Sequence, residues 1–158
     1  MQFMSMAEVC SIGQLLQDQC HRVLHTRAVG FKNKADLSDN EIQLLSLRTC
    51  QDCENIVNIC LHHEQVLLHR FDQLQRYCCN PFGAHGAKIA KSLRAVTIEK
   101  SLEIRSLTGR QVKPGEKLCP SCRKTVLKLS NEEKEENIME QGRSDSSSEE
   151  DLQPLVSN

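Results

Sequence analysis

Apolar side chains recur every three or four residues in two stretches of the chain. The first stretch is residues 6–27, and the second, longer one is residues 55–77. Residues at spacings of three and four share one face of an α-helix, so each stretch predicts an amphipathic helix. The apolar face of the longer predicted helix carries Ile56, Cys60, His63, Leu67, Phe71 and Leu74.

Capping signals predict where other helices begin and end. Residues 28–37 have the composition of a linker, and Ser38 followed by Glu41 is a capping box, in which each residue bonds the backbone of the other. We expect this helix to end near Cys50. The longer predicted helix must end before Pro81, because the residue that precedes a proline is pushed out of the helical region.

Two short basic helices are expected beyond that proline, over residues 87–95 and 97–107. Thr97 is a suitable N-cap for the second of them, and Gly109 suits the left-handed position just past its end. Apolar residues become rare in residues 130–158, where Ser and Glu dominate. This composition predicts a disordered acidic tail.

The chain is poor in the large side chains that build a core. It has 158 residues, of which 3% are aromatic, with one Tyr and no Trp. A sheet-rich domain of this size would use more aromatic and β-branched residues. We therefore expect a small, mainly helical domain with a limited core, which needs an additional covalent or metal staple.

Nine cysteines are available for that staple. The N-terminus lacks the basic and apolar segments of a signal peptide, and no apolar run approaches the roughly 18 residues of a membrane span. We expect an intracellular, reducing location without membrane contact, where thiols stay unpaired. The odd count also leaves one cysteine without a disulfide partner.

The strongest candidate for a metal site is Cys119 and Cys122, which follow a Pro-Gly turn and begin a predicted helix. Thiols two residues apart at a turn are typical zinc ligands, since backbone amides can bond both thiolates. Cys79 and His85 could complete a set of three cysteines and one histidine that binds Zn²⁺. Cys78 competes with Cys79 for the same role, and the sequence alone does not separate them.

A second metal site is possible in a compact group of four residues: Cys50, Cys53, Cys60 and His63. These four residues lie within fourteen positions of one another. In the competing interpretation, Cys60 and His63 are core residues on the apolar face of the helix. Four further residues are expected to be ordinary helix residues and not ligands: Cys10, Cys20, His21 and His25.

The C-terminal cysteine pattern resembles a cysteine-rich module found in uncharacterised animal proteins, some of them associated with transposons. The resemblance is carried by three strings: Leu74-Gln75-x-x-Cys78-Cys79-x-Pro81-Phe82-x-x-His85, Ser92-Leu93-Arg94, and Pro114-Gly115-x-Lys117-Leu118-Cys119-x-x-Cys122-Arg123-Lys124. The upstream Cys50, Cys53 and His62-His63-Glu64 also resemble the module, so the resemblance covers roughly residues 45–128. It implies metal binding, and it implies no particular fold or activity.

The fold class that these observations predict is mainly α, a small zinc-stapled helical domain with a disordered acidic C-terminal tail. We divide the chain into an N-terminal amphipathic helix and linker (1–37), a cysteine- and histidine-rich zinc-binding module (38–129) and the tail (130–158). All proposed metal ligands come from the protein, as in structural zinc sites. We find no catalytic constellation, so we expect no enzyme activity and no small-molecule substrate.

Charge is segregated along the chain. Residues 86–128 carry eleven Lys/Arg and three Asp/Glu, a balance of +8, whereas residues 129–158 carry two and nine, a balance of −7. A basic segment next to an acidic tail indicates contact with duplex nucleic acid or chromatin, and hence a nuclear rather than cytoplasmic location. The same pattern is also typical of a solvated helical face beside a disordered end. The alternative is a zinc-stapled adaptor that binds another protein. The expected phosphate contacts are Lys88, Lys91, Arg94, Lys100, Arg105 and Arg110.

Overall fold

The computed structural model describes residues 9–18, 20 and 30–142. Within this part the protein is mainly helical, as the composition predicts. The helices are α1 (Ser11–Leu16), α2 (Asp39–Thr49), α3 (Leu61–Glu64), α4 (Phe71–Leu74), α5 (Ile98–Thr108) and α6 (Pro120–Gln141), with a 3₁₀ turn η1 (Lys34–Asp36) and a π-helical turn η2 (Gln65–His69). The strands are β1 (Phe31–Asn33), β2 (Asn58–Cys60), β3 (Arg94–Ala95) and β4 (Lys117–Leu118).

Two helices begin and end at the residues that their local signals predict. The Ser38 hydroxyl accepts a hydrogen bond from the Glu41 amide at 3.2 Å, and the Glu41 carboxylate accepts one from the Ser38 amide at 2.8 Å. Helix α2 then ends at Cys50. Thr97 caps α5 through the Lys100 amide at 3.1 Å, and Gly109 ends it with a φ of 69°.

The single helix predicted over residues 55–77 is wrong. Residues Asn58–Cys60 instead form β2, which pairs antiparallel with β1, so the predicted linker at 28–37 contains a strand. Short helical pieces follow, and Arg70 interrupts them with a φ of −113° and a ψ of 4°. The apolar pattern still predicts burial correctly for its members from Ile56 to Phe71, which are buried, but not for Leu74, which is exposed.

Three other expectations about helices require correction. Residues 87–95 are not helical, because Arg94–Ala95 pairs as β3 with β4. Helix α6 continues through Gln141, so disorder does not begin at residue 130. In the predicted N-terminal helix, α1 ends at Gln17, which has a φ of 53°. Much of the 6–27 stretch, including His21 and His25, and the last part of the acidic tail (143–158) lie outside the described residues.

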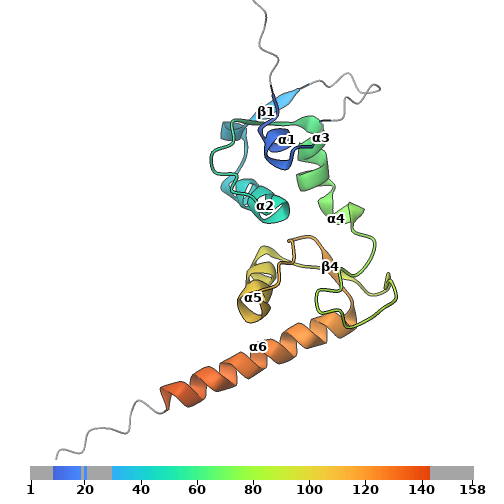
Figure 1. Cartoon of the computed structure of the whole chain (residues 1–158), viewed down its shortest axis with the longest axis vertical. Coiled ribbons are helices and arrows are strands. Elements are labelled where there is room, and N and C mark those ends of the chain that lie inside the picture. Colours follow the sequence, from blue (N-terminus) through green and yellow to red (C-terminus); the bar gives the residue numbers. More distant parts are fainter. Residues whose placement is uncertain (1–8, 19, 21–29, 143–158) are drawn as a thin grey trace, which may run out of the picture.

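The described residues form two hydrophobic clusters. One contains residues from α1, α2, β2 and η2, centred on Ile12, Leu45 and Ile59, and the other gathers around Ile104 and Val112 beside α5 and β4. In Figure 1 the first group of elements lies above the second, and α6 runs along the lower side of the molecule.

Arg48 of α2 joins the two clusters. Its side chain is only 6% exposed. The guanidinium donates to the Leu67 carbonyl at 2.7 Å on one side and to the Pro114 carbonyl at 2.9 Å on the other. It also lies 4.3 Å from the ring centroid of Phe71 and forms an ion pair with Asp72 at 3.3 Å. A buried cation thus connects backbone segments that belong to different halves of the protein.

Candidate metal centres

Two groups of cysteine and histidine side chains converge in the described part of the chain. The first comprises Cys10, Cys20, Cys60 and His63, and the second comprises Cys78, His85, Cys119 and Cys122. Within each group the potential ligand atoms all lie within 4.8 Å of one another. Each group therefore offers three sulfur atoms and one imidazole nitrogen around a single point.

Helix starts position the first group. Cys10 is the N-cap of α1, and its Sγ accepts the Gly13 amide at 3.4 Å and the Cys60 amide at 3.2 Å. Cys60 is in turn the N-cap of α3 and accepts the His63 amide at 3.4 Å. These backbone donors favour thiolates over thiols, because they bond the charged form of the sulfur.

The orientation of His63 is set by the side chains on both sides of its ring. Its Nδ1 faces the three sulfur atoms, at 3.2 Å from Cys60, 3.5 Å from Cys10 and 3.7 Å from Cys20. Its Nε2 lies 3.3 Å from the Asp18 carboxylate. A carboxylate on the far nitrogen is the usual second partner of a metal-bound histidine, since it holds the ring and fixes the tautomer.

The second group is assembled at the start of α6 and in the loop before β3. Cys119 is the N-cap of α6, Pro120 occupies its first turn, and Cys122 lies in the same turn. Cys78 and His85 approach from the other side of the site: Cys78 Sγ is 3.7 Å from Cys122 Sγ and 3.4 Å from His85 Nε2. The other ring nitrogen of His85 faces the Ala87 carbonyl at 2.9 Å.

Asn80 holds the loop that connects Cys78 to His85. It adopts a φ of 46°, a left-handed conformation that Asn tolerates better than most residues. Its side-chain amide donates to the His85 carbonyl at 2.7 Å, and its backbone amide donates to Cys78 Sγ at 3.4 Å. One residue therefore shapes the turn and stabilises the sulfur.

These separations match a tetrahedral zinc site. Zinc bonds of about 2.3 Å to sulfur and 2.0–2.1 Å to nitrogen place the sulfur atoms about 3.8 Å apart and the sulfur and nitrogen atoms about 3.5 Å apart. The Cys78–Cys122 and His63–sulfur distances fall close to these values. Gly13 also lies against the first group, where an added Cβ would come within 3.1 Å of Cys20 Sγ.

The pKa values show how closely the thiols interact in each group. Burial opposes ionisation of Cys10, but hydrogen bonds with His63 and with backbone amides lower its pKa to about 6. The contact with Cys10 in turn raises the pKa of His63. Burial also opposes ionisation of Cys119, and amide and thiol hydrogen bonds lower its pKa to about 7. Burial and the neighbouring sulfurs raise the pKa of Cys122 to about 12.

Cys78, rather than Cys79, lies in the second group. Cys78 forms a parallel bridge with Lys117, and the Cys79 amide donates to the Lys117 carbonyl at 2.9 Å. Successive side chains of an extended segment point to opposite sides, so only one of the two thiols can face Cys119. Burial raises the pKa of Cys79 to about 12, and its thiol stays protonated at neutral pH.

Cys50 and Cys53 do not lie in the group that contains Cys60 and His63. Cys53 is fully buried in the first hydrophobic cluster, with its sulfur 3.6 Å from the Thr49 hydroxyl, and Cys50 is exposed at the end of α2. Cys60 and His63 are joined instead by Cys10 and Cys20, two cysteines that we expected to be ordinary helix residues. The spacing of Cys10 and Cys20 in the sequence has no feature that would have identified them.

The six basic residues proposed for phosphate contact differ in their surroundings. Lys88 lies over the Tyr77 ring at 5.1 Å, Lys100 pairs with Glu103, and Arg110 donates to the Pro81 carbonyl at 2.7 Å. The remaining three are exposed and, within the described residues, make no side-chain hydrogen bond or ion pair: Lys91, Arg94 and Arg105.

No protein-family model matches this chain, and no solved structure matches it significantly. Among the described residues, no helix has both the length and the apolar character that crossing a membrane requires.

Proposed function

We propose that this protein is a non-catalytic zinc-binding module that binds one Zn²⁺ in each cysteine–histidine group. The convergence of three sulfurs and one imidazole nitrogen in both groups is the observation that supports it. Thiolate and imidazole ligands in tetrahedral arrangement favour zinc over the hard cations, which prefer oxygen. Four protein ligands leave no open coordination position, so both ions have a structural role and neither activates a substrate.

Zinc would join segments that lie far apart in the sequence. The first site connects α1 to α3, and the second connects the Cys78–His85 loop to α6. Structural zinc contributes about 10–16 kcal/mol in finger peptides at neutral pH, which is comparable to the whole stability of an ordinary domain. The folded state is therefore expected to depend on the metal.

A chelation experiment tests this dependence. Zinc is removed from the full chain with a strong chelator under reducing conditions, and the helical circular dichroism and thermal unfolding are recorded before and after. We expect the cooperative unfolding transition to disappear and to return when zinc is restored. An unchanged unfolding temperature after complete removal would contradict a structural role.

For the partner of the module, we propose duplex nucleic acid, bound through the basic segment 86–128. Its support is the charge of +8 on this segment and the exposed side chains of Lys91, Arg94 and Arg105, which pair with no side chain in the described part of the protein. Such contacts are made to phosphates and carry little sequence information. The scarcity of aromatic side chains disfavours stacking on single-stranded bases. Reduced thiol ligands and a DNA partner together suit a nuclear location.

The salt dependence of duplex binding tests this partner. Each phosphate contact contributes about 0.9 to the slope of log K against log salt, so Arg94→Ala with Arg105→Ala should reduce the slope by about two. Arg70→Ala is the matched control, since Arg70 is exposed in the other half of the protein. Failure of the zinc-loaded chain to bind duplex DNA at low salt would remove this proposal and favour the protein adaptor.

A protein adaptor is the alternative, and one observation favours it. Helix α6 exposes large apolar side chains, among them Leu127, Ile138 and Met139. Exposed apolar residues on a long helix are typical of helix-mediated recognition.

A further inference from the structure

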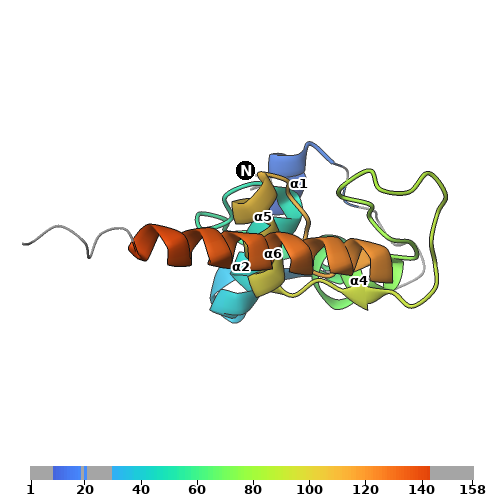
Figure 2. The same ribbon diagram turned by 90° about the horizontal axis from the view of Figure 1, so that it is seen from below.

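Helix α6 has an outward face, beside the face that packs on α5, on which large apolar side chains are exposed. Its inner face packs through Cys122, Val126 and Ser130, which are buried. The adjacent side, roughly 100–120° around the helix from this inner face, carries Leu127, which is 61% exposed, and Ile138, which is 70% exposed. Figures 1 and 2 show that the C-terminal half of α6 extends past α5 and away from the rest of the molecule.

The charges along α6 are divided between its two halves. Residues 120–131 contain three Lys/Arg and no Asp/Glu, a balance of +3. Residues 132–142 contain one Lys and five Glu, a balance of −4. Two such helices side by side attract each other only when they run in opposite directions, because each basic half then lies against an acidic half.

We propose that the outward face of α6 binds the same face of a second copy of this chain, as an antiparallel helix pair. This inference goes beyond the proposed zinc-binding function and does not depend on the nature of its partner. Leu127, Asn131, Lys134 and Ile138 alternate at spacings of four, three and four, as the seam positions of a coiled coil do. An antiparallel pair that places Leu127 against Ile138 of the second copy also places Asn131 against its Lys134.

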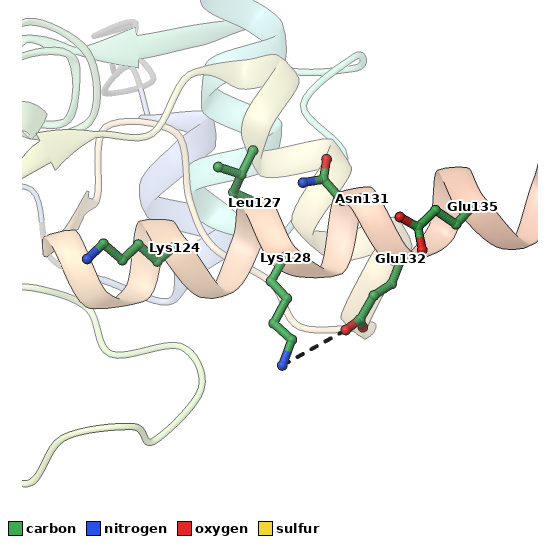
Figure 3. A pocket seen from close by; sticks show the side chains of 6 residues that line it. All are labelled: Lys124, Leu127, Lys128, Asn131, Glu132 and Glu135. Carbon is green, nitrogen blue, oxygen red and sulfur yellow. Dashed lines mark ion pairs between the residues drawn. The ribbon is translucent and has the colours of Figure 1, made fainter.

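Lys128 and Glu135 flank this seam on the same side. Figure 3 shows both beside a shallow hollow on α6, whose lining is Lys124, Leu127, Lys128, Asn131, Glu132 and Glu135. Within one chain Lys128 is paired only loosely, at 4.0 Å from Glu132 with both side chains exposed. Seven residues separate Lys128 from Glu135, about 10.5 Å along one helix, so these two do not pair within a chain.

Between antiparallel copies the same two residues become neighbours. In the proposed register, Lys128 of each chain lies beside Glu135 of the other, which makes two equivalent ion pairs around the twofold axis. A parallel pair would instead set the basic half of each helix against that of the other chain. The arrangement of charge thus specifies the direction of the pair, and the polar Asn131 layer specifies its register.

Sedimentation equilibrium of the full, zinc-loaded chain tests the proposal. We expect a reversible dimer that weakens as salt increases, since exposed ion pairs are screened. Lys128→Glu alone and Glu135→Lys alone should each raise the dissociation constant roughly tenfold, because each change replaces two attractions with two repulsions. The double variant Lys128→Glu with Glu135→Lys should dimerise as the unmodified chain does. Circular dichroism of each variant verifies that α6 remains folded.

The rescue by the double variant separates the possible outcomes. Rescue supports an antiparallel pair, because the two residues are too far apart to compensate each other within one helix. A double variant whose dissociation constant is higher than that of either single variant would contradict the antiparallel register. A chain that stays monomeric up to millimolar concentration would overturn the proposal altogether. Ile138→Asp adds an independent check, since Ile138 is exposed in the single chain and its change should weaken only the dimer.

Discussion

Removal of the Arg48 side chain is the change that most directly tests how the two halves of the protein are joined. Arg48→Ala deletes the hydrogen bonds to the Leu67 and Pro114 carbonyls and the contact with the Phe71 ring. It also releases Asp72, whose side chain is 58% exposed and can be hydrated without a large penalty. The lost stability therefore comes from the two buried carbonyls, which lose their donor, and from the packing of the arginine stem.

The magnitude follows from these contacts. A hydrogen bond from a charged group contributes about 1.5–3 kcal/mol, and a partly buried cation–π contact contributes about 0.5–2 kcal/mol. Water that enters the space left by the guanidinium will recover part of this by bonding the free carbonyls. We expect Arg48→Ala to lower the free energy of unfolding by about 3–5 kcal/mol, the sum of two such hydrogen bonds and the cation–π contact less the part that water recovers.

Denaturant unfolding of the zinc-saturated chain measures this change. Arg70→Ala is the control, because it removes an exposed arginine close to the same contacts and should cost no more than about 0.5 kcal/mol. A loss below about 1 kcal/mol in Arg48→Ala, similar to that of the control, would refute the reasoning. The two hydrophobic clusters would then be joined by something other than this residue.

Other changes test the sites themselves. Cys78→Ser should reduce bound zinc by one ion per chain, whereas Cys79→Ser should leave it unchanged, as measured by elemental analysis. Gly115→Ala should destabilise the fold by about 2–4 kcal/mol in denaturant unfolding, since its φ is 92° and an added Cβ would overlap surrounding side chains. The lowered pKa values of Cys10, about 6, and Cys119, about 7, leave the Cys10 sulfur mostly ionised and the Cys119 sulfur about half ionised at neutral pH. Their contribution to zinc binding is present above these values and lost as the pH falls through them, so a chromogenic zinc dye should detect release on acidification. A zinc affinity, measured by competition with the dye, that does not fall between a pH well above 7 and a pH well below 6 would contradict this assignment.

Local signals in the sequence predicted the features that depend on neighbouring residues. The capping box at Ser38 and the caps of α5 at Thr97 and Gly109 each involve atoms no more than four residues apart. The Cys119–Cys122 pair was recognisable for the same reason, since its position at the start of α6 follows from the turn and from Pro120.

Features that depend on distant residues could not be predicted in this way. The pairing of β2 with β1 converts part of an apparent helix into a strand. The bridge between Cys78 and Lys117 decides which of two adjacent thiols faces the second site. Cys10 is held at the first site by contacts with β2, among them the Cys60 amide, which bonds its sulfur across fifty residues of sequence. None of these contacts leaves a signal in the local sequence, because the spacing of apolar residues and the composition near the residues involved are the same with or without it.

The zinc content of the purified full chain tests the central claim most directly. Elemental mass spectrometry of the reduced, dialysed protein should give two zinc ions per chain, and Cys10→Ser and Cys119→Ser should each reduce this to one. Cys50→Ser should still bind two, because Cys50 lies outside both groups. A chain that binds no zinc, or that keeps two ions when Cys10 or Cys119 is replaced, would contradict the assignment of these groups as metal sites.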